Sequence, residues 1–264
     1  MKLPYFLIDA FTDRTFTGNP AAVYVLKEPL SDDLMQKIAA EMNLSETAFV
    51  LRSRNATRLR WFTPTTEVDL CGHATLASAH ALFTAVDQPQ RGVITFDSAS
   101  GALICKQTPA GIRLDFPATP PSPTPTDAII CEQLGVTDPI YFGRSKFDYL
   151  IHLSCEEDVL GLAPNFSALA GIATRGFIVT AEANAADLDF VSRFFAPATG
   201  VNEDPVTGSA HCCLGPYWAT YLKKPALHAA QRSERGGSLA VEVVADRVLL
   251  TGRAVLVGRG ELLL

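Results

Sequence analysis

The sequence predicts an α+β protein with two pseudo-symmetric lobes, each formed by a rolled β-sheet or barrel around a central helix. The first observation is a duplication: residues 60–68 and residues 193–201 are identical at five of nine positions without a gap. The second is an apolar helical segment after each copy, and the third is a set of short strand patterns around each segment. Two matching segments about half a chain apart indicate two similar lobes, and a chance match between short windows is the alternative.

Both duplicated segments lead into the same kind of helix start. Gly72-His73-Ala74 follows the first copy and Gly208-Ser209-Ala210 follows the second, each through a short acidic stretch. Small apolar residues continue from both steps, and a helix that is apolar on all sides is a buried one. We therefore expect a central helix in each lobe, enclosed by the strands of that lobe. The lobes are expected to be related by a pseudo-twofold axis and to meet at a cleft.

The first lobe contains short runs of β-branched and aromatic residues between turn residues, which predict strands. Ser31 is a candidate N-cap for a helix in which Leu34, Ile38 and Met42 form an apolar stripe. The central helix is expected from Gly72 to about Val86. The predicted strands are Pro4–Asp9, Ala21–Leu26, Ala48–Arg52, Arg58–Phe62, Gly92–Asp97, Leu103–Gln107 and Gly111–Asp115.

The second lobe repeats this scheme with a short helix, a series of strands and a second central helix. The central helix is expected over Gly208–Leu222, with a disturbance at Gly215-Pro216 because proline removes a backbone donor. The short helix is expected over Asp127–Leu134. Leu188–Phe194 leads into the second copy of the duplicated segment. Strands are predicted at Asp148–His152, Phe177–Thr180, Ser238–Val244, Arg247–Gly252 and Ala254–Val257.

A proline-rich segment separates the two copies. Residues 116–125 include five prolines, a composition that favours an extended chain and excludes a helix or a central strand. This segment predicts a linker at residues 117–125. The first lobe then spans residues 1–116 and the second spans residues 126–264, with the last strand a candidate to return to the first lobe.

The composition excludes several classes of function. A net charge of −6, a pI near 5.4 and the lack of a basic stripe argue against a nucleic-acid partner. No apolar run approaches the roughly 20 residues of a membrane span, and the N-terminus does not resemble a signal peptide. The six cysteines have no zinc-ligand spacing, so we expect reduced thiols, no metal and a cytoplasmic location.

The two helix starts are candidate binding sites for a small carboxylate. A helix N-terminus presents unpaired N–H groups and a partial positive charge, which favour an anion. Glycine allows close packing as well, so Gly72 and Gly208 are also explained by the burial of the two helices. His73 follows Gly72 directly, where the helix dipole keeps an imidazole near neutrality; a satisfied core histidine is the alternative.

Two acidic residues lie where they can act on a ligand. Glu46 lies between the amphipathic helix and an apolar strand, where partial desolvation would raise its pKa and suit a general acid or base. Asp204 precedes Pro205 and is therefore expected on an extended segment ahead of the second central helix. The segment from Val201 to Gly208 is three residues longer than its counterpart. A solvated turn glutamate and a surface-loop aspartate are the alternatives.

Five motifs, in this order, closely resemble the phenazine-biosynthesis PhzF-like isomerase family over essentially the whole chain. They are Phe16-Thr-Gly-Asn-Pro-Ala-Ala-Val23, Asn43-Leu-Ser-Glu-Thr-Ala-Phe49, Arg60-Trp-Phe-Thr-Pro64, Leu70-Cys-Gly-His-Ala-Thr75 and Glu203-Asp-Pro-Val-Thr-Gly-Ser-Ala210. The resemblance implies the diaminopimelate-epimerase-like fold and an isomerase that needs no cofactor and no metal. It also implies a homodimer.

The resemblance implies a role for each motif residue. Glu46 would move a proton between two carbons of a small carboxylate similar to trans-2,3-dihydro-3-hydroxyanthranilate. His73, Asp204 and Ser209 would bind and polarise the substrate. Contacts to the substrate and its carboxylate would come from Asn19, Ser45, Gly72, Thr207 and Gly208.

Two other functions remain open on the sequence. The sister epimerases and proline racemases use one cysteine from each lobe, and Cys71 stands where one of these belongs, but Pro205-Val206 occupies the other neighbourhood. A one-thiol epimerase that depends on Cys71 is therefore one alternative, and a non-catalytic small-molecule binding protein is the other. Ser209 and His211 do not predict a hydrolase, because side chains two apart on a helix do not face each other.

Overall fold

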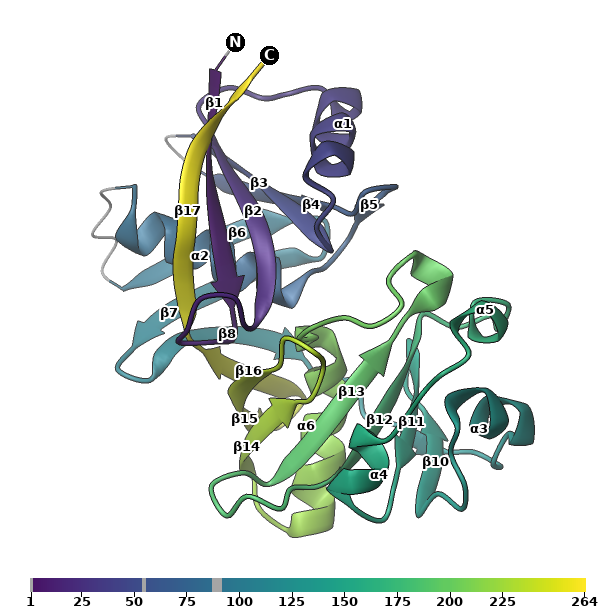
Figure 1. Ribbon diagram of the computed structural model, residues 1–264. Coiled ribbons are helices and arrows are strands. Elements are labelled where there is room, and N and C mark those ends of the chain that lie inside the picture. The colour runs from purple at the N-terminus through teal and green to yellow at the C-terminus, as the bar shows by residue number, and fades with distance from the viewer. Residues whose placement is uncertain (1, 54–55, 87–91) are drawn as a thin grey trace. The chain divides into compact units, whose positions relative to one another are not determined.

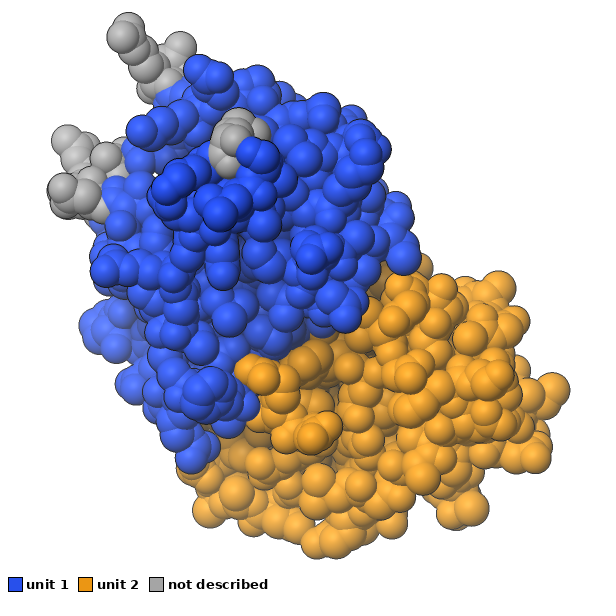
Figure 2. Space-filling model, turned by 45° about the horizontal axis from the view of Figure 1, so that its top comes forward, with its two compact units in different colours: residues 1–116, 250–264 blue, residues 117–249 orange. Residues whose placement is uncertain are grey.

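The computed structural model describes residues 2–53, 56–86 and 92–264 (Figure 1). These residues divide into two compact units (Figure 2). Unit 1 consists of Met1–Phe116 and Leu250–Leu264, and unit 2 consists of Pro117–Leu249. The C-terminal strand thus belongs to the same unit as the N-terminal strand. No helix in the described part of the chain is both long and apolar enough to cross a membrane.

Unit 1 is a rolled sheet around helix α2 (Gly72–Thr84). The last strand, β17 (Ala254–Leu263), pairs antiparallel with β1 (Lys2–Ala10) along its whole length, apart from one bulge. Helix α2 packs against β1, β2, β3 and β17, and it is buried from Gly72 to Ala79. The remaining strands are β2 (Asn19–Leu26), β3 (Glu46–Arg52), β4 (Thr57–Phe62), β5 (Glu67–Val68), β6 (Val93–Ser98), β7 (Gly101–Thr108) and β8 (Gly111–Pro117).

Helix α1 (Asp32–Met42) covers β3 and β4 on the outside of this sheet. The hydroxyl of Ser31 accepts a hydrogen bond from the backbone N–H of Leu34 at 3.3 Å, so Ser31 is the predicted N-cap. Met35, Ile38 and Ala39 are the buried face of the helix. They pack into a core that includes Tyr24, Phe49 and Phe62.

Unit 2 contains the corresponding helix α6 (Gly208–Leu222), which packs against β14 and β15. The strands of this unit are β9 (Ser122–Pro123), β10 (Tyr141–Arg144), β11 (Asp148–His152), β12 (Gly176–Glu182), β13 (Phe190–Phe195), β14 (Ala226–Gln231) and β15 (Gly237–Val244). Strand β16 (Arg247–Gly252) then leads towards β17. The short helices are α3 (Ala128–Leu134), α4 (Glu156–Leu160), α5 (Phe166–Leu169) and the 3₁₀ helix η1 (Pro197–Thr199).

The two units repeat one succession of strand pairings. In unit 1 the pairs β1–β2, β2–β3, β3–β4, β4–β6 and β6–β7 are antiparallel, parallel, antiparallel, parallel and antiparallel. In unit 2 the pairs β10–β11, β11–β12, β12–β13, β13–β14 and β14–β15 follow the same order. Each unit therefore uses the same local topology around one central helix, as the duplication predicts.

The structure corrects three details of the sequence prediction. Helix α6 continues through Pro216, because the carbonyl of Cys212, which the proline leaves without its helical donor, accepts a hydrogen bond from Thr119 N at 3.0 Å. Strands β10 and β14 were not predicted, since their sequences contain few β-branched residues. Strand β17 runs to Leu263 rather than Val257.

The central helix of unit 2 is also less enclosed than expected. Tyr221, near its C-terminal end, is 45% exposed. In unit 1 the ten-residue strand β17 extends the sheet beyond β1, whereas the matching strand β9 in unit 2 has only two residues, both exposed. The shorter strand provides less sheet to cover the helix.

Candidate active site

Glu46 and Asn19 lie at the same end of two neighbouring parallel strands. Glu46 is the first residue of β3 and is opposite Ala21 of β2, two residues after Asn19. Asn19 is fully buried, whereas the Glu46 side chain is 18% exposed. This placement gives Glu46 a carboxylate that is partly desolvated yet accessible.

His73 is the second residue of α2 and joins these two side chains. Its Nε2 lies 3.5 Å from Glu46 Oε2, and its Nδ1 lies 3.0 Å from Asn19 Nδ2. The imidazole is only 3% exposed, and this burial lowers the pKa of His73 to about 3. The ring is therefore neutral at physiological pH.

Asn19 determines which ring nitrogen of His73 carries the proton. With the Asn19 amide N–H donating to Nδ1, the neutral ring has its own hydrogen on Nε2, on the side of Glu46. The 3.5 Å distance between Nε2 and Glu46 Oε2 is long for a hydrogen bond, and this nitrogen forms none within the described structure. His73 thus presents a neutral N–H donor beside a carboxylate.

Cys71 is the N-cap residue of α2, and its side chain is a buried thiol. Its Sγ lies 3.5 Å from His73 Nδ1. Glu46, Cys71 and His73 each offer one metal-ligand atom, and these atoms lie within 4.8 Å of one another. A cation bound to Nδ1 would have to displace the Asn19 amide hydrogens.

The first residues of α2 supply the remaining groups of unit 1. Gly72 is buried at the helix start, where the first backbone N–H groups have no partner within the helix. Ser45 is half-buried and directly precedes Glu46. The predicted site residues Asn19, Ser45, Glu46, Gly72 and His73 are thus gathered at the starts of β2, β3 and α2.

In unit 2, Asp204 is held just ahead of α6 by Thr207 and Gln231. The Thr207 hydroxyl donates to Asp204 Oδ2. Gln231 Nε2 donates to the carbonyl of Asp204 at 2.7 Å and to the Thr207 hydroxyl at 3.2 Å, while its Oε1 accepts from Thr207 N at 2.9 Å. Both donor groups of Thr207 are therefore used within the unit. Gln231 is a functional candidate that the sequence did not reveal.

Ser209, the second residue of α6, belongs to a different hydrogen-bond network. Its hydroxyl accepts from Arg175 Nη1 at 2.9 Å. Arg175 also forms two parallel hydrogen bonds with the carboxylate of Asp148, which is 1% exposed. Arg175 and Asp148 were also missed, although both charges lie beside the starts of predicted strands, the signal that had marked Glu46.

His211 lies further along α6 and does not serve Ser209. Its Nδ1 donates to the carbonyl of Thr207 at 2.8 Å, and burial lowers the pKa of His211 to about 4. Gly208, the first residue of the helix, is buried like its counterpart Gly72. Within the described part of the chain, Ser209 and His211 therefore have separate partners and do not form a Ser-His pair of the kind used in hydrolysis.

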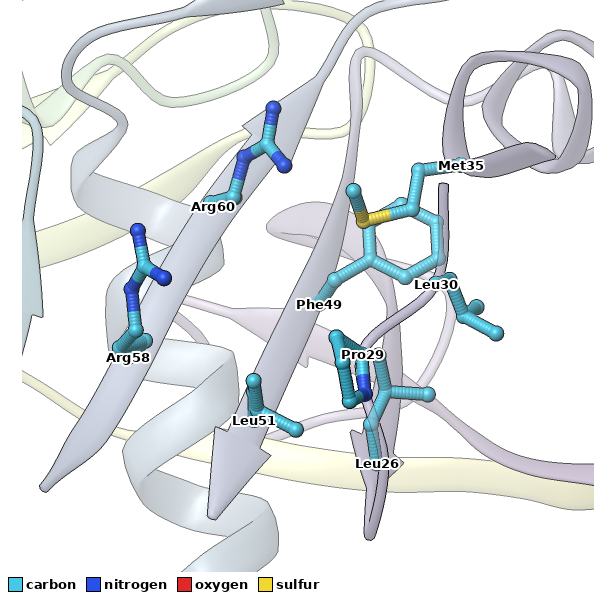
Figure 3. A pocket seen from close by; sticks show the side chains of 8 residues that line it. All are labelled: Leu26, Pro29, Leu30, Met35, Phe49, Leu51, Arg58 and Arg60. Carbon is cyan, nitrogen blue, oxygen red and sulfur yellow. The ribbon is translucent and has the colours of Figure 1, made fainter. Parts of the chain in front are cut away.

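A separate cavity in unit 1, of about 60 Å³, is lined by six apolar side chains and two arginines (Figure 3). Arg60 at its edge is already paired with Asp32 and Glu67. The cavity contains none of the predicted site residues and no acid, so it is not a candidate for proton transfer. Its lining consists of Leu26, Pro29, Leu30, Met35, Phe49, Leu51, Arg58 and Arg60.

The repeated rolled sheet around a central helix defines the class of the protein by its fold, which is that of the diaminopimelate epimerases. The family model of phenazine biosynthesis-like proteins (PhzC-PhzF) matches residues 8–260. The chain is 51% identical to an uncharacterized isomerase of Halalkalibacterium halodurans over 267 residues, and the match covers 100% of both chains.

Solved structures agree with this assignment. A PhzF-family phenazine biosynthesis protein from Enterococcus faecalis superimposes with a TM-score of 0.95 at 44% identity, covering 100% of both chains. A hydroxyproline epimerase from Agrobacterium vitis has a TM-score of 0.61 at 12% identity, with 99% of this chain and 91% of that one covered, and shows the shared fold. The protein belongs to the PhzF-like family and is an isomerase. This excludes the alternative of a non-catalytic small-molecule binding protein.

Proposed function

We propose that this isomerase moves a proton between two carbons of a small carboxylate, with Glu46 as its general acid and base and without a cofactor. The observation that carries the proposal is the half-buried Glu46 carboxylate 3.5 Å from the neutral His73 ring at the start of α2. A substrate similar to trans-2,3-dihydro-3-hydroxyanthranilate fits this chemistry, because its reacting carbons lie close to its carboxylate.

The proton transfer proceeds in two balanced steps. Glu46 first takes a proton from one substrate carbon and becomes a neutral carboxylic acid, while the electron pair of the broken C–H bond is delocalised in the substrate. The acid then returns a proton to a second carbon and the carboxylate is restored. The Nε2–H group of His73 stabilises the negative charge in between, since a neutral donor in a water-poor site needs no reorganisation.

The other site residues bind the substrate or support those that do. The backbone N–H groups at each of the two helix starts, at Gly72 and at Gly208, suit an anionic group such as a carboxylate. Asp204 suits an amino or hydroxyl group, Ser209 polarises the substrate, and Ser45 and Asn19 border the first half of the site. Thr207 acts through Asp204, because its hydroxyl and its N–H are both engaged.

The proposal includes the setting in which the enzyme works. We propose a homodimer in the cytoplasm that acts on a small molecule and binds neither nucleic acid nor membrane. The net charge of −6 and the free cysteines support this setting. Size-exclusion chromatography with light scattering tests the dimer, and a monomer at micromolar concentration would refute it.

Isotope exchange tests the role of Glu46. The wild type, supplied with its substrate in deuterated water, should incorporate deuterium at carbon. Glu46→Gln should abolish incorporation without changing the circular dichroism spectrum. Glu41→Gln, an exposed glutamate on α1, is the matched control and should exchange like the wild type. Full exchange by Glu46→Gln would remove Glu46 from its role.

A Cys71-dependent epimerase is the second candidate, because Cys71 Sγ lies 3.5 Å from His73 Nδ1. In that case Cys71→Ala would abolish exchange and Glu46→Gln would not. The isomerase proposal expects the opposite result for the same two variants. Labelling of Cys71 with iodoacetamide adds a check, since a thiol base would be protected by substrate and its labelling would track the loss of activity.

A further inference from the structure

The hydroxyl of Ser209 has a fixed direction as a hydrogen-bond group. A serine hydroxyl has one donor and two acceptor positions, whereas a guanidinium has donors alone. Arg175 Nη1, at 2.9 Å, therefore occupies an acceptor position of Ser209. The hydroxyl hydrogen has to point away from Arg175, towards another acceptor.

Arg175 is itself held firmly. Its Nε and Nη2 donate in parallel to the two carboxylate oxygens of Asp148, an arrangement that suits the planar guanidinium. The guanidinium carbon lies 4.9 Å from the ring centre of Phe147 and 5.6 Å from that of Phe194. Because Asp148 is 1% exposed and the two rings limit the guanidinium, Nη1 can be directed at Ser209 without a large entropic cost.

Strand register identifies the residue of unit 1 that corresponds to Arg175. Gly176 is opposite Asp148 in the parallel pair β11–β12, as Glu46 is opposite Ala21 in the parallel pair β2–β3. Arg175 therefore corresponds to Ser45, and Gly176 corresponds to Glu46. A Cβ on Gly176 would lie 2.4 Å from Phe194 Cζ, so this position cannot accept an acid without rearrangement.

We propose that Arg175 is a positioning residue that makes Ser209 an obligate hydrogen-bond donor, so that the group bound at the start of α6 is the carboxylate of the substrate. A carboxylate is an acceptor without hydrogens, and it matches both the Ser209 O–H and the N–H groups of the helix start. A neutral amide places an NH₂ group against one of these donors. This inference rests on the proposed function because it uses the same substrate.

Ligand binding tests the inference without relying on turnover. Anthranilate and anthranilamide, which differ in the charged group alone, are titrated into the wild-type protein by calorimetry. Anthranilate should bind at least about 10-fold more tightly, the range expected when a charged hydrogen bond is exchanged for a mismatched one. Equal affinity for the two compounds, or no saturable binding of anthranilate, would overturn the proposal.

A double-mutant cycle separates positioning from general structural support. Arg175→Lys and Ser209→Ala should each reduce the preference for anthranilate by about 10-fold, and the double variant should be no worse than Ser209→Ala. Multiplied losses in the double variant would show that Arg175 does not act through Ser209. Arg60→Lys is the matched control, because Arg60 pairs with Glu67 and lies over the Phe62 ring in the same manner. It should keep the preference unchanged.

A further variant tests the same inference in a second way. If Arg175→Lys does not fold, Asp148→Asn loosens the guanidinium while leaving it in place, and its loss should again vanish in the Ser209→Ala background. A persistent loss in that background would contradict the inference. Retained deuterium exchange in Glu46→Gln would refute the proton-transfer proposal, whereas equal affinity of the wild type for anthranilate and anthranilamide would refute this one, so the two failures give different results.

Discussion

The two units share one topology but differ at the residues that begin their strands and central helices. In unit 1 the start of β3 carries Glu46 and the second residue of α2 is His73. At the corresponding positions unit 2 has Gly176 and Ser209, with Arg175 beside them. The duplicated scaffold thus provides two similar helix starts, one with an acid and an imidazole and the other with a serine contacted by an arginine.

Each helix start uses a neighbouring side chain to orient its polar residue. Asn19 donates to Nδ1 of His73, and Arg175 donates to the hydroxyl of Ser209. In both cases an acceptor position is filled from within the unit, so the remaining hydrogen is available for a ligand. The two helix starts therefore use the same kind of hydrogen bond with different donors and acceptors.

The largest effect on stability is expected when the Arg175–Asp148 ion pair of unit 2 is broken. Arg175→Ala leaves the buried Asp148 carboxylate without its cation, which should reduce the free energy of unfolding by about 3–5 kcal/mol. Urea unfolding of the pure variant measures the change. Arg175→Ala combined with Asp148→Ala should recover much of it, and a double variant as unstable as the single one would show that the charge was not the cause.

A smaller loss of stability is expected if Gly176 of unit 2 is given a side chain. Gly176→Ala places a Cβ against Phe194, which should cost about 1–3 kcal/mol of folding free energy. Gly258→Ala, where a Cβ meets no atom within 4 Å, is the control in unit 1. A Gly176→Ala variant as stable as the wild type would mean that Phe194 adjusts, and that sterics do not exclude an acid there.

The pH dependence of stability should identify the neutral imidazole of unit 1. Burial lowers the pKa of His73 to about 3 from 6.5, so between these values the unfolded chain binds a proton that the folded chain does not. The contribution of His73 is fully present above pH 6.5 and is lost as the pH falls towards 3. The free energy of unfolding, measured with urea at several pH values in this range, should change less steeply with pH in His73→Gln than in the wild type. The exposed control His228→Gln should leave this slope unchanged. An unaltered slope in His73→Gln would contradict a neutral buried ring.

The smallest effect is expected at Thr207. Thr207→Val removes the hydroxyl that donates to Asp204, and the net cost of one such bond is about 1 kcal/mol. If Thr207 acts through Asp204, the substrate KM should rise by less than in Asp204→Asn, and the two changes should not multiply. Steady-state kinetics of the three variants decides this, and fully multiplied effects would indicate an independent contact with the substrate.

Local patterns predicted most of this structure. Strands such as β11 and helices such as α3, with its N-cap Asp127, follow from apolar runs and capping residues read over a few positions. Strand β14 was not predicted, because its Leu-His-Ala-Ala segment is extended through its pairing with β13 and β15. Within the site, motif residues were recognisable, whereas Arg175, Asp148 and Gln231 meet their partners across 24 to 34 residues of chain. Such pairings depend on strand register, which the sequence does not state.

The central claim, that a single carboxyl group in unit 1 both removes and returns the proton, is tested most directly by label transfer. Substrate that carries deuterium at the reacting carbon is converted in one turnover in ordinary water, and the product is analysed by mass spectrometry. Because Glu46 is 18% exposed and shielded by its neighbours, part of the label should appear at the second carbon. Complete loss of the label to water, with full turnover in Glu46→Gln, would contradict the account.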